Sequence, residues 1–234
     1  EAAIRGAQVV VNLVGILAES GKQTYANVQA AGAGAIAEAA AAAGARVVHV
    51  SAIGADENSK SVYARSKALG EKAVLGAVPG ATILRPSIIF GPEDQFFNRF
   101  ALLAQLSPVL PLIGGGATLF QPVFVGDVAT AVADAVEGKS APGTTYELGG
   151  PEIVTFRQVL EFILRTIERE RLLVPLPFFA AKFQSYFLRY APGAFKLTPD
   201  QVELLKRDNV VSDEAKAARR TFEAFGIAPS TMEA

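Results

Sequence analysis

The stretch Arg46-Val47-Val48-His49-Val50-Ser51 decides the fold class, because it is short, apolar and rich in β-branched residues. Such a run is typical of a strand that is buried on both faces of a sheet. Working outward, Gln8–Gly15 and Ala81–Arg85 have the same character, and helical patterns over 24–43 and 61–77 separate the three runs. This alternation of strand and helix predicts a parallel sheet with crossover helices, and hence an α/β fold.

Further elements are predicted along the chain. In order, we expect a helix over 96–106, a loop over 110–118, an extended segment over 119–125, a helix over 128–136 with Asp127 as its N-cap, a strand over 145–148, and helices over 155–169, 198–206 and 213–225. The predicted fold is therefore a doubly wound parallel sheet, Rossmann-like, over residues 1–150, with a smaller and mainly helical part over 151–234.

A Gly-rich dinucleotide fingerprint is not found where it would be functional. The formal match Gly32-Ala33-Gly34-Ala35-Ile36-Ala37 lies well inside a helical pattern, whereas a phosphate-binding loop must leave a strand and open a helix. We interpret these glycines as helix-packing residues. The triplet Gly114-Gly115-Gly116 is not followed by a helix of a strand-helix-strand unit either. We expect that the chain starts partway through a doubly wound domain, after the strands and the turn that would hold a pyrophosphate.

Composition excludes several classes of function. The chain has 234 residues, a net charge of −1 and no basic stripe, so nucleic-acid binding is not expected. It has no cysteine, which rules out a disulfide framework, a thiolate nucleophile and a cysteine zinc site. No carboxylate and histidine cluster has the spacing of metal ligands, so no metal is expected. The lack of cysteine favours a reducing compartment, and we expect a cytoplasmic location.

Tyr63 and Lys67 are the residues that point most directly to chemistry. They lie four positions apart in a helical pattern and so share one helix face. A cation in this position can lower the pKa of the phenol and hold a sugar hydroxyl, which suits proton transfer beside a nicotinamide. Because this spacing is common by chance, its context has to support the interpretation.

That context resembles a known family. The stretches concerned are Val11-Asn12-Leu13-Val14-Gly15, the strand ending in Ser51, Tyr63-Ala64-Arg65-Ser66-Lys67 with Glu71 behind it, Leu84-Arg85-Pro86-Ser87-Ile88-Ile89-Phe90-Gly91-Pro92, and Gln121-Pro122-Val123-Phe124-Val125-Gly126-Asp127-Val128-Ala129. Together they resemble the extended and atypical short-chain dehydrogenases/reductases. More narrowly, His49-Val50-Ser51-Ala52-Ile53-Gly54-Ala55 and Leu197-Thr198-Pro199-Asp200-Gln201-Val202, followed by Asp208-Asn209-Val210-Val211, are similar to bacterial relatives of the Rossmann-type accessory subunit of respiratory complex I, NADH:ubiquinone oxidoreductase.

The resemblance implies a cofactor, NAD(P)(H), with NADP slightly favoured, and a role for each matching residue. Tyr63 would be the acid/base, and Lys67 would hold the nicotinamide ribose and lower the tyrosine pKa. Asn12–Gly15 would line the adenosine side, and Pro86–Ile88 would pack on the nicotinamide carboxamide. The expected cofactor-binding residues are Leu13, Val14, Gly15, Ser51, Tyr63, Lys67, Pro86, Ser87 and Ile88.

The position of the catalytic serine decides between two functions. Active family members place a Ser or Thr at the end of the strand before the tyrosine helix; here either Ser51 or Ala52 occupies that place. If it is Ala52, a donor to the substrate oxygen is lost, which typically costs several kcal/mol of transition-state stabilisation. The leading hypothesis is a protein of the complex I accessory-subunit type that holds its nucleotide mainly for structural reasons. The alternative is an NAD(P)-dependent reductase or epimerase with Tyr63, Lys67 and Ser51 as catalytic residues.

Three further features of the sequence allow two interpretations each. The aromatic stripe over 175–195 is either core or a surface that docks on a respiratory complex or a membrane, peripheral at the inner membrane. His49, the single histidine, is a buried, hydrogen-bonded strand residue or a catalytic base. Arg85 and Arg99 either meet an anionic group at the cleft or have a surface role.

Overall fold

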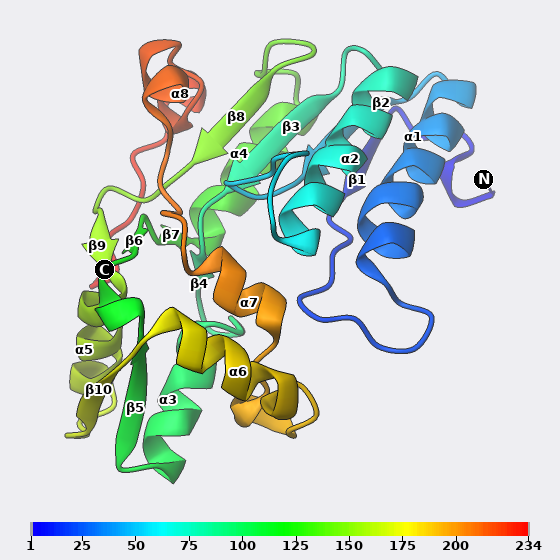
Figure 1. The fold of residues 1–234 in the computed structure, drawn as a ribbon. Helices are drawn as coiled ribbons and strands as arrows, with labels where there is room; N and C mark the ends of the chain where they lie inside the picture. Colours follow the sequence, from blue (N-terminus) through cyan, green and yellow to red (C-terminus); the bar gives the residue numbers. More distant parts are fainter. Residues whose placement is uncertain (1, 234) are drawn as a thin grey trace.

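A computed structural model describes residues 2–233, and a four-stranded sheet organises the first half of the chain (Figure 1). Its strands are β1 (Val9–Asn12), β2 (Arg46–Val50), β3 (Thr82–Pro86) and β8 (Thr145–Leu148), in that spatial order. All neighbouring pairs are parallel. The carboxyl ends of the strands therefore share one edge, where ligands of such sheets bind.

Helices cover both faces of this sheet, which confirms the predicted doubly wound α/β fold. α1 (Gly32–Ala42) and α2 (Val62–Ala77) lie on one face, and α4 (Val125–Val136) lies on the other (Figure 1). Because successive side chains of a strand point to opposite faces, each strand contributes residues to the cores on both sides of the sheet. Val47 and Ile83 join the core cluster with α1 and α2, whereas Val48 and Leu84 join the cluster with α4.

The helix predicted over 24–43 forms as two segments. A π-helical segment, Ala26–Ala31, runs directly into α1. A Cβ placed on Gly34 would lie 3.3 Å from the Cβ of Ala73 in α2, and a Cβ on Gly70 would overlap the carbonyl of Gln29. Gly34 of the formal fingerprint is thus a helix-packing residue, as predicted.

A second group of elements lies below the sheet in Figure 1. It contains the helices α3 (Phe97–Leu106), α5 (Phe156–Thr166), α6 (Phe178–Leu188) and α7 (Pro199–Leu204), and the strands β5 (Val109–Ile113) and β10 (Leu172–Leu176), which pair with each other in parallel. Aromatic rings fill its core, and members of this core come from both sides of residue 150: Phe96, Phe97, Phe100, Phe120 and Phe156 contact one another.

Short elements complete the structure: the two-residue strands β4 (Ile89–Phe90), β6 (Leu119–Phe120), β7 (Val123–Phe124) and β9 (Val154–Thr155), the helix α8 (Asp213–Ala217), and 3-10 turns over Ala2–Ile4, Gly114–Gly116, Gly193–Phe195 and Phe222–Phe225. Among residues 2–233, no helix combines the length and apolarity needed to cross a bilayer.

Three sequence-based expectations were wrong. The loop over 110–118 is in part β5, which accommodates Pro111 because a two-stranded sheet leaves one side of each strand unpaired. The fourth helix begins at Val125, so Asp127 is not its N-cap; the Asp127 carboxylate instead accepts a hydrogen bond from the Ser230 N–H at 2.7 Å. The helix over 213–225 ends at Ala217, followed by a separate 3-10 turn.

Candidate functional site

The helix that carries Tyr63 and Lys67 is capped by a residue from the far end of the chain. Ser61 is the N-cap of α2, and its hydroxyl accepts a hydrogen bond from the Ala64 N–H at 3.2 Å. The carboxylate of Asp200, in α7, accepts hydrogen bonds from the Ser61 hydroxyl at 2.8 Å, the Val62 N–H at 2.6 Å and the Tyr63 N–H at 3.2 Å. A carboxylate here satisfies backbone donors and complements the positive end of the helix dipole.

Lys67 is a buried cation with few partners. Its side chain is 5% exposed, and its Nζ donates one long hydrogen bond, 3.3 Å, to the Val50 carbonyl at the end of β2. The structure brings Gly15 close to it, because a Cβ on Gly15 would lie 3.3 Å from this Nζ. Burial lowers the pKa of Lys67 to about 8, although the Glu71 carboxylate one turn along α2 raises it. An ammonium has three donors, so Lys67 retains unused hydrogen-bonding capacity.

The phenol of Tyr63 does not behave as expected from the sequence. Its ring is half-buried and makes an edge contact with the buried ring of Tyr25, at 5.7 Å between centroids and 84° between planes. Burial raises the pKa of Tyr63 to about 12. For the chain as described, burial thus shifts the pKa of this phenol upward, contrary to the expectation that Lys67 lowers it.

Two buried polar atoms at the end of β2 lack a partner among residues 2–233. The Ser51 hydroxyl is one, in a residue that is 5% exposed, while its backbone N–H donates to the Leu84 carbonyl at 2.7 Å. The other is Nε2 of His49, whose Nδ1 lies 3.0 Å from the Asn12 amide nitrogen. Burial, and then the nearby Lys67 charge, lowers the pKa of His49 to about 4. His49 is thus the buried, hydrogen-bonded strand residue that was one of its two interpretations.

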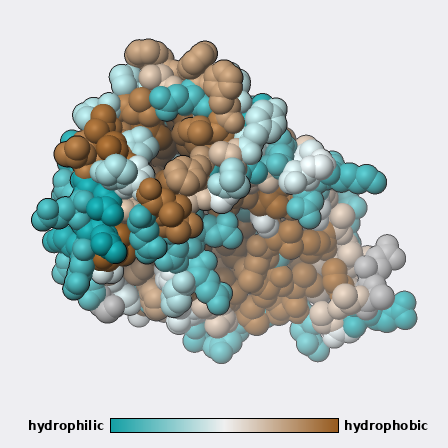
Figure 2. Space-filling view, turned by 90° about the horizontal axis from the view of Figure 1, so that it is seen from below, coloured by the Kyte–Doolittle hydropathy of each residue, from teal (hydrophilic) through white to brown (hydrophobic). Residues whose placement is uncertain are grey.

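The segment after β1 is exposed and apolar. Leu13 is 65% and Val14 52% exposed, and Gly15 is exposed as well. Gln29 fixes the next residues against α2: its amide donates to the Ile16 carbonyl at 2.8 Å and accepts from the Ser66 hydroxyl at 2.6 Å. Figure 2 shows that the molecule, seen from below, has a broad hydrophobic area.

Asn209 holds the segment after β3 in place. Its side-chain oxygen accepts hydrogen bonds from the Ser87 hydroxyl at 2.7 Å and the Ile88 N–H at 3.0 Å, and its amide donates to the Ile53 carbonyl at 3.3 Å. Pro86 is buried, and its carbonyl accepts from the Ile53 N–H at 3.0 Å. The Ser87 hydroxyl is therefore already occupied by protein, unlike that of Ser51.

Neither arginine near the inferred cleft is free for an anion. Arg85 donates two hydrogen bonds to Glu71, at 2.9 and 2.6 Å, and lies 3.6 Å from Glu147. Arg99 donates to the backbone carbonyls of Ala194, at 3.0 Å, and Lys196. Both guanidinium groups thus have structural roles.

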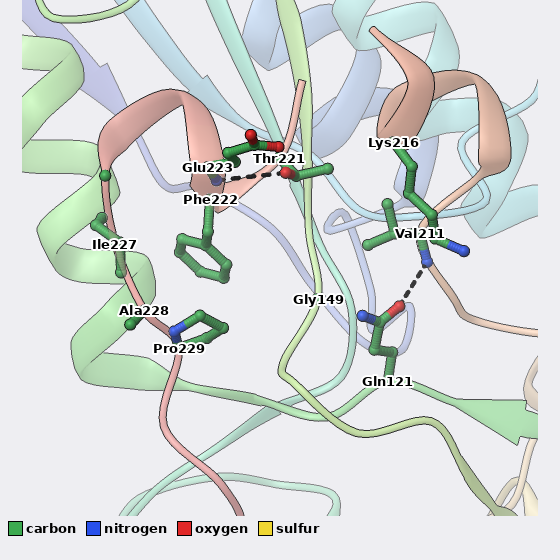
Figure 3. Close-up of a pocket in the computed structure, with 11 residues that line it drawn as sticks. Gln121, Gly149, Val211, Lys216, Thr221, Phe222, Glu223, Ile227, Ala228 and Pro229 are labelled. Carbon is green, nitrogen blue, oxygen red and sulfur yellow. Dashed lines mark hydrogen bonds between the residues drawn. The ribbon is translucent and has the colours of Figure 1, made fainter. Parts of the chain in front are cut away.

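A separate cavity of about 460 Å³ lies away from these residues, beside β8 (Figure 3). It is lined by Gln121, Gly149, Val211, Lys216, Phe222 and Pro229, among others. Its Gln121 side chain is already paired: the amide donates to the Gly150 carbonyl at 2.7 Å and accepts from the Val211 N–H at 3.0 Å. None of the predicted site residues lines this cavity.

Sequence reasoning missed three residues that build the site. Gln29 has the one signal that was available, a long polar side chain within an Ala- and Gly-rich helical run. Tyr25 and Asp200 carry no local signal, because their partners are distant in sequence. The Asp200 segment was recognised as a helix start, but its contact with α2 depends on tertiary structure alone.

An open parallel sheet with helices on both faces, and unsatisfied polar groups at the carboxyl edge of its strands, defines the class of Rossmann-type α/β proteins. The family described as RmlD substrate binding domain matches residues 14–182, and the chain belongs to this family.

Curated relatives are similar over much of the chain. It is 40% identical over 181 residues to the mitochondrial NADH dehydrogenase (ubiquinone) 1 alpha subcomplex subunit 9 of Arabidopsis thaliana, covering 73% of this chain and 44% of that protein. It is 33% identical over 233 residues to the subunit of the same name from Mus musculus, covering 99% and 60%. A ceramide reductase of Caulobacter vibrioides is 44% identical over 109 residues, covering 47% and 34%. The chain thus spans 44% and 60% of the lengths of the two subunits.

Solved structures share the fold. The crystal structure of gox2253 matches with a TM-score of 0.69 at 20% identity, covering 97% of this chain and 76% of that one. UDP-glucuronic acid 4-epimerase from Bacillus cereus in complex with NAD matches with 0.64 at 19% identity, covering 88% and 78%. dTDP-4-dehydrorhamnose reductase from Bacillus anthracis in complex with NADP matches with 0.59 at 15% identity, covering 73% and 66%.

Proposed function

We propose that this chain binds a nicotinamide dinucleotide at the carboxyl edge of its sheet and acts as an accessory subunit of the complex I type, holding the nucleotide mainly for structural reasons. The observation that carries the proposal is the pair of underused polar groups at the end of β2. Among residues 2–233, the Ser51 hydroxyl has no partner, and the buried Lys67 ammonium has one long hydrogen bond. Buried polar groups normally find partners, so a ligand with hydroxyl groups is the expected complement.

The residues present fit the ribose end of such a nucleotide. Gly15 lies close to Lys67, and a Cβ at this position would lie 3.3 Å from its Nζ. Leu13 and Val14 offer exposed apolar surface to a base, and Ser51 offers a free hydroxyl. The nucleotide would supply hydride transfer when bound; the chain supplies the groups that hold its sugar. We favour NADP over NAD on the family resemblance, and structures with this fold hold either one.

A structural rather than a catalytic use of the nucleotide agrees with the ionisation of the site. With its pKa raised to about 12, the Tyr63 phenol stays protonated near neutral pH and is a poor general base. The similar proteins from plant and mouse are named as subunits of an NADH dehydrogenase. A respiratory complex is accordingly the partner that we propose, with a peripheral location at the inner membrane.

Thermal unfolding of the full chain with NADPH and with NADH tests the nucleotide site. A ligand at 100 times its Kd stabilises a protein by about 2.7 kcal/mol, which raises the Tm measurably. Lys67→Met should remove this shift. Lys72→Met is the matched control, because Lys72 lies on the same helix but its ammonium is exposed and pairs with Glu57 at 3.0 Å. If neither nucleotide raises the Tm of the parent protein, the proposed site is wrong.

A second candidate function is reduction of a keto group on a lipid. It is favoured by the similarity to the ceramide reductase. It is also favoured by the Ser51 hydroxyl, which has no partner among residues 2–233 and could donate a hydrogen bond to a substrate oxygen. Oxidation of NADPH by the full chain in the presence of a long-chain keto lipid, followed at 340 nm, decides between the two. Turnover that disappears in Tyr63→Phe would establish the enzyme and displace the structural role.

A further inference from the structure

The outward face of α6 carries an aromatic surface that nothing in the described chain covers. Five rings lie at the spacing i, i+4, i+7, i+8 and i+11, the first four within α6 and the fifth in the turn that follows it. This spacing places the rings of the helix on one side. They are Phe179 (79% exposed), Phe183 (67%), Tyr186 (52%), Phe187 (67%) and Tyr190 (78%). We call this set the α6 aromatic face. The interpretation of the stripe as core is therefore wrong for these five residues.

The opposite side of α6 is firmly packed, so the exposure of these rings is not a sign of a loose helix. Ala181 and Ser185 are fully buried, and Phe178 packs into the aromatic core of the second part. α6 lies beside α7 at the front of the molecule (Figure 1), and Lys182 reaches Glu203 of α7 at 3.4 Å. The helix is apolar on both sides, and among residues 2–233 only the inner side has a partner.

The aromatic surface is large for an unpartnered one. At ~150 Å² or more for each ring, the exposed fractions amount to on the order of 500 Å². The largest apolar patch of a typical monomer is of similar size and is often functional. Leu172 (69% exposed) and Val174 (46%) of the adjoining strand β10 add apolar surface next to it in sequence.

The charged residues near the α6 aromatic face indicate what kind of surface it contacts. From Leu172 to Pro199 the chain has no acidic residue, whereas it has Lys182, Arg189 and Lys196, in a protein whose net charge is −1. By helical spacing, Lys182 and Arg189, the C-cap of α6, flank one edge of the aromatic face. Lys182 also pairs with Glu203 of α7, and the Arg189 guanidinium lies 4.9 Å from the ring of Tyr190. Rings that enter the acyl boundary and cations that remain at the headgroups form the pattern of an interfacial helix on anionic lipid.

We propose that the α6 aromatic face lies in the headgroup region of an anionic membrane. α6 has 11 residues. At about 1.5 Å per residue, a helix of this length suits an orientation along the membrane surface. The inference deepens the peripheral location within the proposed function, but its evidence is independent of the nucleotide site. Loss of nucleotide binding would leave it intact.

Flotation of the full chain with vesicles tests the proposal. The protein is expected to float with equimolar phosphatidylcholine and phosphatidylglycerol, and much less with phosphatidylcholine alone or at high salt. Phe183→Ser with Phe187→Ser should reduce the floating fraction about tenfold or more, given the transfer free energy of two rings. Leu102→Ser with Leu106→Ser is the matched control, because these side chains are 43% and 60% exposed on α3. Its flotation should equal that of the parent.

A label gives a second readout. The chain has no cysteine, so Tyr186→Cys with an environment-sensitive fluorophore reports on this face alone, and Leu106→Cys is its control. A blue shift with anionic vesicles at position 186 and none at 106 is expected. No flotation, or flotation unaffected by the phenylalanine substitutions, would overturn the proposal. So would binding of a purified respiratory complex in detergent through these phenylalanines without any vesicle binding, which would assign the face to a protein.

Discussion

Asp200 caps the helix of Tyr63 and Lys67 by accepting a hydrogen bond from the backbone N–H of Val62, at 2.6 Å. The two residues are 138 positions apart, so a residue near the end of the chain fixes the first turn of the helix that carries the candidate site. The same carboxylate binds the Ser61 hydroxyl and the Tyr63 N–H. Through Asp200, the second group of elements thus helps to form the first turn of α2, a helix that covers the sheet.

Asp200→Ala is expected to destabilise the protein by about 2 kcal/mol, since loss of a helix cap costs about 0.5–2 kcal/mol and this one serves three donors. The midpoint of urea unfolding measures the change. Asp213→Ala is the control: Asp213 lies in the first turn of α8 and its carboxylate is fully exposed. If both substitutions lowered the free energy of unfolding equally, the three hydrogen bonds of Asp200 would contribute no stability of their own.

Lys67 should make stability depend on pH. Its pKa falls from an ordinary 10.5 to about 8 in the folded protein, so between these values the unfolded chain binds more protons. Stability therefore rises as the pH increases from about 8 to 10 and is lowest where Lys67 is fully charged, below 8. Lys67→Met should be more stable than the parent at pH 7, on the order of 3 kcal/mol, and should lack this rise. If the free energy of unfolding changed with pH in the same way in the parent and in Lys67→Met, the lowered pKa of Lys67 would be contradicted.

Tyr63→Phe should leave nucleotide affinity within a few-fold of the parent and abolish any turnover. The phenol is half-buried against Tyr25 and Lys67 retains its own donors, so the ring rather than the hydroxyl maintains the local packing. Calorimetric titration with NADPH measures the affinity. A large loss would identify the phenol as mainly a binding group.

Two glycines of α2 should respond oppositely to alanine. At Gly70 a Cβ would overlap the carbonyl of Gln29, whereas at Gly76 it would meet nothing within 4 Å. Gly76→Ala should therefore stabilise by about 0.5–1 kcal/mol through helix propensity. Gly70→Ala should destabilise, because two helices would have to separate. Thermal unfolding checks both, and a stabilised Gly70→Ala would mean that the helices are not in close contact.

The sheet, its flanking helices and the packing role of Gly34 were predictable, because buried strands and amphipathic helices have local patterns. β5 was missed because Pro111 argued against a strand, and its pairing with β10 joins segments far apart in sequence. The division at residue 150 remains a prediction, as do the roles of the site residues. The raised pKa of Tyr63 was not predictable, since it depends on burial in the folded protein, where the ring also contacts Tyr25.

The long-range cap also sets an order of events during synthesis. Val62 emerges from the ribosome 138 residues before Asp200 does, so until then the tyrosine helix has an incomplete first turn. A nascent chain arrested between these two points would hold that helix with the Ser61 cap alone.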